Sequence, residues 1–122
     1  MQNILKNLFN DCEKTGDLTL ICKDSINVKC HSFLLQLQSE YFKGLFNFHK
    51  DTKNCNVQYE SKLVKLVLNK LYDPSYKFGK LELDEIFQIN KMIDEFLIVE
   101  SGDIRNELTS SVKLLLNTLI LI

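Results

Sequence analysis

The sequence predicts an α+β fold, because its apolar residues change from a strand-like to a helical spacing along the chain. In residues 18–22 and 26–30 every second side chain, starting from the first, is apolar, so that these side chains share one face as in a half-buried β-strand. The polar residues 23–25 lie between these runs and predict a β-hairpin. Beyond His31 the apolar residues follow a helical period over most of the chain. The buried side of the hairpin would consist of Leu18, Leu20, Cys22, Ile26, Val28 and Cys30.

A first helix is predicted over residues 3–12, before the hairpin, and Gly16 marks its expected end. Its apolar residues follow the i, i+1, i+4, i+5 spacing of a single stripe. Left in water, four such side chains would form a sizeable patch, so either the protein's own core or a second subunit must cover them. We call these four residues the N-terminal stripe: Ile4, Leu5, Leu8 and Phe9.

Two short helices are predicted after the hairpin, and a serine separates them. Ser39 is expected to cap the second helix, with Glu40 in its first turn. The apolar residues that we expect to pack the first helix are Phe33, Leu34, Leu35 and Leu37. Those of the second helix are Tyr41, Phe42, Leu45 and Phe46.

The second half of the chain is predicted to be mainly helical. Residues 47–56 are polar and should form an exposed loop, with Phe48 as the exception, and residues 55–59 a third short strand. Leu81 and Leu83 alternate with Glu82 as a short strand would. The helices and their expected N-caps are 61–71 with Ser61, 84–97 with Asp84 and 103–119 with Asp103. The solvated face of the first of them would hold Lys62, Lys65, Asn69 and Lys70.

One spacing in the first half of the chain resembles the signature of the BTB/POZ domain. It runs Asp17-Leu-x-Leu, then His31-x-x-x-Leu35-x-x-x-Ser39-x-Tyr41-Phe42. Residues 62–72, 80–86 and 96–101 (FLIVES) are similar to later passages of that family, in the same order. The resemblance implies one domain over residues 1–122, with a small β-sheet flanked by about five to six helices. Its parts would be a dimerisation helix at 1–13, a core at 14–100 and a C-terminal helix at 101–122.

The resemblance also implies a function, because this family is a protein-protein interaction module without chemistry of its own. The protein would homodimerise through Ile4, Leu5, Leu8 and Phe9 and act as an adaptor or scaffold, for example for a cullin-RING ubiquitin ligase. Two alternatives are an oligomerisation domain of a transcriptional regulator and a domain that self-associates without binding cullin. The candidate contacts to another protein are Tyr41, Phe48, His49 and Asp51.

Two positions depart from the family pattern where partners bind. In transcription-factor members a basic residue after the histidine pairs with the aspartate of the first strand, and here Ser32 stands opposite Asp17. Cullin-binding members carry a hydrophobic-x-Glu motif after the second short helix. Here Phe48 is followed two residues later by Lys50, and Asp51 comes one place too late. The scaffold positions therefore follow the family, while the partner-facing ones do not.

Composition argues against several other functions. With 15 basic and 16 acidic residues the net charge is -1, which gives no field to attract nucleic acid or an anionic membrane. Arg105 is the only arginine, the residue best suited to phosphate. The terminal run 112–122 is too short to cross a membrane. The lack of Ala and Trp beside abundant Lys, Asn, Ile and Leu suggests an AT-rich genome, such as that of a large DNA virus or a protist.

No cofactor, metal or catalytic site is predicted. The four cysteines form no C-x-x-C pair and the N-terminus lacks a signal peptide, so we expect reduced thiols and an intracellular protein, in cytoplasm or nucleus. A zinc site from Cys30, His31 and Cys55 would lack the usual ligand spacing. We expect His31 to be a structural residue, hydrogen-bonded to backbone, since no nucleophile and acid are suitably spaced around it.

Overall fold

The computed structural model describes residues 2–99 and 102–121, with all side chains except those at positions 2, 3, 5 and 118–121. The last two residues of FLIVES and the side chain of Leu5 therefore lie outside the described part. Within it there are seven helices and three strands, which confirms the α+β prediction with more helices than expected. They are α1 Gln2–Asn10, α2 Cys12–Thr15, β1 Leu18–Ile21, β2 Asn27–Cys30, α3 Ser32–Gln38, α4 Glu40–Phe48, β3 Asn54–Asn56, α5 Ser61–Tyr72, α6 Leu83–Glu95 and α7 Gly102–Leu121.

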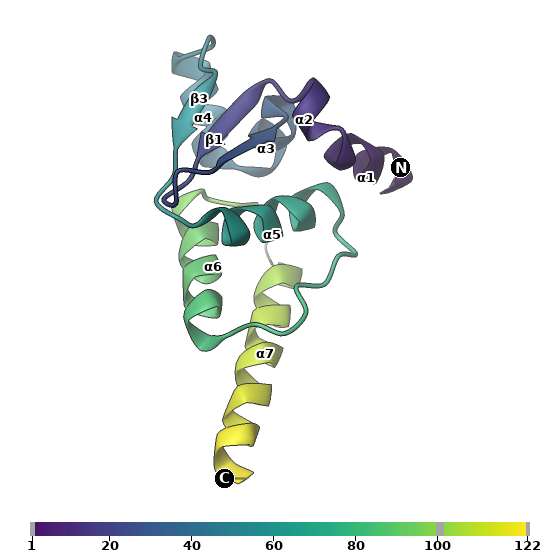
Figure 1. Cartoon of the computed structure of the whole chain (residues 1–122), viewed down its shortest axis with the longest axis vertical. Coiled ribbons are helices and arrows are strands. Elements are labelled where there is room, and N and C mark those ends of the chain that lie inside the picture. The colour runs from purple at the N-terminus through teal and green to yellow at the C-terminus, as the bar shows by residue number, and fades with distance from the viewer. Residues whose placement is uncertain (1, 100–101, 122) are drawn as a thin grey trace.

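The molecule is elongated, with its two chain ends far apart (Figure 1). The sheet and helices α1 to α4 occupy one end, α5 and α6 lie in the middle, and α7 projects from the other end. The predicted first helix is divided at Asp11 into α1 and the single turn α2. Gly16 follows α2 as predicted, and a side chain there would collide with the Cys12 carbonyl oxygen, 2.5 Å from the position of its Cβ.

The three strands form one sheet in the order β2-β1-β3. Strands β1 and β2 pair antiparallel, which confirms the hairpin, and β3 pairs parallel to β1. The predicted buried side holds except at Ile26, which is half exposed because it lies in the turn before β2 begins. The third strand forms at Asn54–Asn56, earlier than the predicted 55–59, and the buried Val57 and Tyr59 follow it without pairing as a strand.

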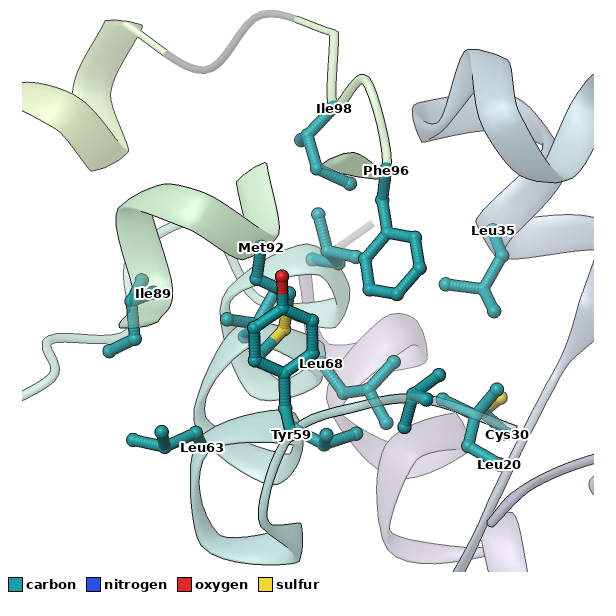
Figure 2. Close-up of a cluster of buried hydrophobic side chains, with 14 of the residues drawn as sticks. Leu20, Cys30, Leu35, Tyr59, Leu63, Leu68, Ile89, Met92, Phe96 and Ile98 are labelled. Atoms are coloured by element: carbon teal, nitrogen blue, oxygen red, sulfur yellow. The ribbon is translucent and has the colours of Figure 1, made fainter. Parts of the chain in front are cut away.

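The core lies between the sheet and the helical layer of α5 and α6. Figure 2 shows side chains from both meeting there, among them Leu20 of β1, Leu68 of α5 and Met92 of α6. All are buried, as is Phe96, which follows α6. The stripe of α5 is buried as predicted and consists of Leu63, Val64, Val67, Leu68 and Leu71.

The prediction that Ser61 caps α5 is wrong. Glu60 holds the N-cap position and Ser61 is the first residue of the helix. Its backbone N–H and its hydroxyl both donate to the carboxylate of Asp24, the hydroxyl at 2.8 Å. An aspartate in the hairpin turn therefore accepts the hydrogen bonds of the first residue of α5. The fold brings the two residues together, although they are far apart in the sequence.

The other two predicted caps are also shifted. Helix α6 begins at Leu83, with Glu82 as its N-cap in a reciprocal capping box with Glu85. Asp84 therefore lies in the first turn, and no strand forms at residues 81–83. Helix α7 begins at Gly102, so Asp103 likewise lies inside its first turn, where its charge favours the positive end of the helix dipole.

The burial of two side chains is the reverse of what was predicted. Lys70, expected in solvent, is only 4% exposed, because Glu107 of α7 pairs with its ammonium group and the Phe78 ring lies 5.0 Å from it. The helix predicted over residues 84–97 would place Leu97 on its apolar side with Ile93 and Phe96. Leu97 is exposed instead, because the chain has left the helix and Leu97 takes a φ of 51°. The burial of Lys70 depends on contacts with segments distant in the sequence, and the exposure of Leu97 depends on where α6 ends.

Candidate interaction surfaces

The N-terminal stripe is divided between the core and solvent. Ile4 is 68% exposed, while Leu8 and Phe9 are half-buried and pack against the core. The ring of Phe9 lies 5.0 Å from that of Tyr72 at the end of α5. The N-terminal stripe therefore packs on the core through Leu8 and Phe9, while its other edge, at Ile4, is open to solvent.

Helix α3 carries a second apolar surface, formed by residues that were predicted to pack inside. Its buried residues are Leu34 and Leu35, whereas Phe33 and Leu37 are 50% and 72% exposed. These last two are spaced i, i+4, so they share one face, and a seven-residue helix cannot turn four apolar residues toward one core. The i, i+4 spacing of Phe33 and Leu37 is the feature of the sequence that indicates their shared face. They line an open groove of about 450 Å³ together with Gln36, Glu40, Lys43 and Asn47.

The four candidate contacts to another protein lie along α4 and just beyond it. Phe48 is 85% exposed at the end of the helix and does not fold back, and His49 and Asp51 are exposed next to it. Tyr41 lies in the first turn, with its ring 5.5 Å from the ring of Phe96. The spacing of Tyr41, Leu45 and Phe48 is i, i+4, i+7, so one stripe about 10 Å long runs along α4.

Asp17 has a local partner in place of the family's basic residue. Ser32 donates to its carboxylate from the backbone N–H at 2.8 Å and from the hydroxyl at 2.6 Å. Burial alone would raise the pKa of Asp17, but these hydrogen bonds outweigh it and hold the pKa below its usual value. Lys50 and Lys53 line an open groove together with Asp17 and Ser32, so basic groups come near Asp17 from the loop after α4 instead.

The remaining signature residues hold the scaffold. Ser39 caps α4 as predicted, accepting from the Phe42 N–H at 3.1 Å, and its hydroxyl donates to the Phe96 carbonyl. Leu35 and Phe42 are buried. His31 is also buried, and its ring bonds side chains rather than the backbone groups expected. These are the side chains of Thr15 and Tyr72, with Cys12 Sγ 3.8 Å from Nδ1.

The described residues contain no group of three or more His, Cys, Asp or Glu side chains that could hold a metal ion. Cys30, His31 and Cys55 are therefore not brought together as zinc ligands. None of the helices in the described part is long and apolar enough to cross a membrane.

The comparisons with known proteins agree with this geometry. No curated protein sequence matches the chain. Among solved structures, the BTB (Tramtrack and Bric a brac) domain of human Gigaxonin superposes with a TM-score of 0.66 at 16% identity, over 93% of this chain and 88% of that one. The BTB domain of zebrafish PATZ1 gives 0.67 at 17% identity, over 95% and 91%. The family profile of the BTB/POZ domain matches residues 5–101. The chain therefore belongs to the BTB/POZ domain family.

Proposed function

We propose that this protein-protein interaction domain forms a homodimer and recruits another protein to the dimer. The observation that carries the first part is the open edge of the N-terminal stripe. Ile4 stands in solvent beside half-buried Leu8 and Phe9, and burying a side chain such as that of Ile4 is worth about 1.5–3 kcal/mol. A two-fold contact, in which the same patch of each subunit takes part, is the usual symmetry of such a pair.

Phe33 of α3 supports an interface wider than α1 alone. A chain of ring contacts runs from Phe9 through Tyr72 and His31 to Phe33, with centroids 5.0, 5.8 and 5.9 Å apart. Phe9 of α1 and Phe33 of α3 therefore lie at the two ends of one aromatic cluster. Together they offer a partner subunit more apolar area than either helix does.

Ile4→Glu is expected to convert the dimer to a folded monomer, because a carboxylate at the open edge of the stripe would be buried without a partner charge. Light scattering on the purified chain in the micromolar range measures the mass. Phe87→Glu is the matched control, since Phe87 is equally exposed at 63% but lies on α6, away from α1 in Figure 1. A monomeric wild type would contradict the proposal. Leu8→Glu with Phe9→Glu should aggregate instead, because both residues also pack on the core.

Recruitment of another protein is proposed through the stripe of Tyr41, Leu45 and Phe48 on α4. Phe48 supports it, because a phenylalanine left 85% exposed at the end of a helix has no role in the core, and aromatic residues are common binding anchors. A cullin is one candidate partner. Lys50 stands where the cullin motif has a glutamate, and its exposed ammonium group reverses the charge at that place.

A pull-down with a cullin N-terminal domain tests this surface. We expect weak retention of the wild type, stronger retention of Lys50→Glu, and none of Lys50→Glu combined with Phe48→Ala. The control is Lys50→Glu with Phe87→Ala, which should bind like Lys50→Glu. Tight binding by the wild type that is lost in Phe48→Ala would mean that Lys50 matters less than its charge suggests. Failure of Lys50→Glu to bind would point to a partner other than cullin.

A further inference from the structure

Tyr72, the last residue of α5, is fully buried where the N-terminal helices meet the core. Its hydroxyl oxygen lies 2.7 Å from His31 Nδ1 and 2.9 Å from the backbone nitrogen of His31. Cys12 Sγ of α2 lies 3.5 Å from the same oxygen, and the ring of Phe9 packs on the ring of Tyr72. One side chain therefore touches α1, α2 and the junction between β2 and α3.

One arrangement satisfies all the hydrogen bonds around Tyr72 at once. In it the hydroxyl oxygen accepts from the backbone N–H of His31 and from the thiol of Cys12, and its own proton goes to His31 Nδ1. With Nδ1 accepting, Nε2 carries the imidazole proton and donates to the hydroxyl of Thr15 at 2.8 Å. Thr15 then donates to the Asp11 carbonyl at 3.1 Å. Every donor along this path has an acceptor, from α5 to the turn between α1 and α2.

This path fixes the position of α2 and, through it, the direction of α1. Helix α2 is one turn long and α1 has nine residues, lengths that are not stable in isolation. Their placement depends on contacts with the core, and the polar ones run through His31 to Tyr72. An interface that is held in place before binding loses less entropy on association than one that must be ordered.

We propose that Tyr72 is a positioning residue for self-association: its ring and hydroxyl seat α1 and α2 on the core without touching the partner subunit. The inference rests on the proposed dimer formed by the N-terminal stripe. Ile4 stands about one and a half turns before Phe9, the anchored end of the stripe, so any loosening at Phe9 and Cys12 displaces it.

Tyr72→Phe keeps the ring and removes the hydroxyl. The His31 N–H then loses its acceptor, while His31 Nδ1 and the Cys12 thiol each lose their closest partner and keep one another at 3.8 Å. We expect the dimer Kd, measured by analytical ultracentrifugation, to rise about tenfold, the effect of losing one to two hydrogen bonds. Ile93→Val is the control, because Ile93 is buried on α6 and its shortening lowers stability without touching this path. Its Kd should not change.

The reactivity of the Cys12 thiol measures directly whether α2 stays packed on the core. Burial raises the pKa of Cys12, so a maleimide should modify it only when α2 leaves the core. Cys30 is fully buried in β2 and is modified only on global unfolding. Mass spectrometry of the two peptides should show faster modification of Cys12, but not of Cys30, in Tyr72→Phe, and equal protection of both in Ile93→Val.

The outcomes separate the two proposals. An unchanged Kd and unchanged Cys12 modification in Tyr72→Phe would overturn the positioning role, as would an equal rise of Kd in Ile93→Val. A monomeric wild type would overturn the dimer, while Cys12 modification would still decide whether Tyr72 seats α2. Should Tyr72→Phe fail to fold, Thr15→Val cuts the path at its outer end and should give the same pattern to a smaller degree.

Discussion

Glu107→Ala is expected to lower the free energy of unfolding by about 3–5 kcal/mol, the usual cost of leaving a buried charge without its partner. The charge is that of Lys70, which is buried on α5 and pairs with Glu107 of α7. The same carboxylate accepts from the Phe78 N–H at 2.7 Å, and the Lys70 ammonium donates to the Tyr76 carbonyl. One glutamate therefore joins α7, α5 and the connection between α5 and α6.

The measurement is urea denaturation followed by circular dichroism at neutral pH. The control is the double change Lys70→Met with Glu107→Leu, which removes both charges and should recover more than half of the loss, since an apolar pair of similar volume is well tolerated. Recovery should be incomplete because the Phe78 N–H then lacks its acceptor. A loss below about 1 kcal/mol in Glu107→Ala would mean that water reaches Lys70 and that the pair is not buried in solution.

Phe42→Ala is expected to cost a similar amount, about 3–5 kcal/mol, because a buried phenylalanine is removed from a well-packed site. Phe42 is 2% exposed, and its ring lies 5.2 Å from those of both Phe96 and Tyr41. Phe96 packs in turn near Leu35 and Ile98 (Figure 2). The loss would therefore open a cavity where α3, α4 and the end of α6 meet.

Tyr41→Ala is the matched control, since Tyr41 is the neighbouring aromatic residue but is exposed. We expect it to lower stability by no more than about 1–2 kcal/mol. Differential scanning calorimetry on both variants would show the difference as a much larger fall in Tm for Phe42→Ala. Equal effects would indicate that the two rings contribute alike to the core, and that Tyr41 is not available to a partner.

The hairpin and the buried stripe of α5 could be predicted from local patterns in the sequence. Alternation over residues 18–22 and the stripe ending at Leu71 each reflect which face of one element is buried, so a short window of sequence contains the information. The caps at Ser61 and Asp84 were placed wrongly, because a cap depends on which oxygen reaches the helix end. At Ser61 that oxygen comes from Asp24, which periodicity cannot indicate.

The candidate surfaces were predictable in part for the same reason. The exposure of Phe48 and Ile4 follows from their local setting, and the spacing of Phe33 and Leu37 would have shown that they face outward. The seating of α2 could not be predicted, because Tyr72 is 41 residues beyond His31 in the sequence. Burial of Lys70 likewise depends on Glu107, which lies 37 residues further on.

The carboxylate of Asp24 has a consequence for how the chain folds. It lies in the hairpin turn next to Ser25, whose φ of 67° is unfavourable for a residue with a side chain, and it accepts from the N-terminus of α5. A two-stranded hairpin alone is marginally stable, and here the Asp24 carboxylate in its turn gains its bonds to Ser61 only when α5 is present. The rate-limiting step of folding should therefore bring hairpin and α5 together, a nucleus of distant segments rather than a hairpin formed beforehand.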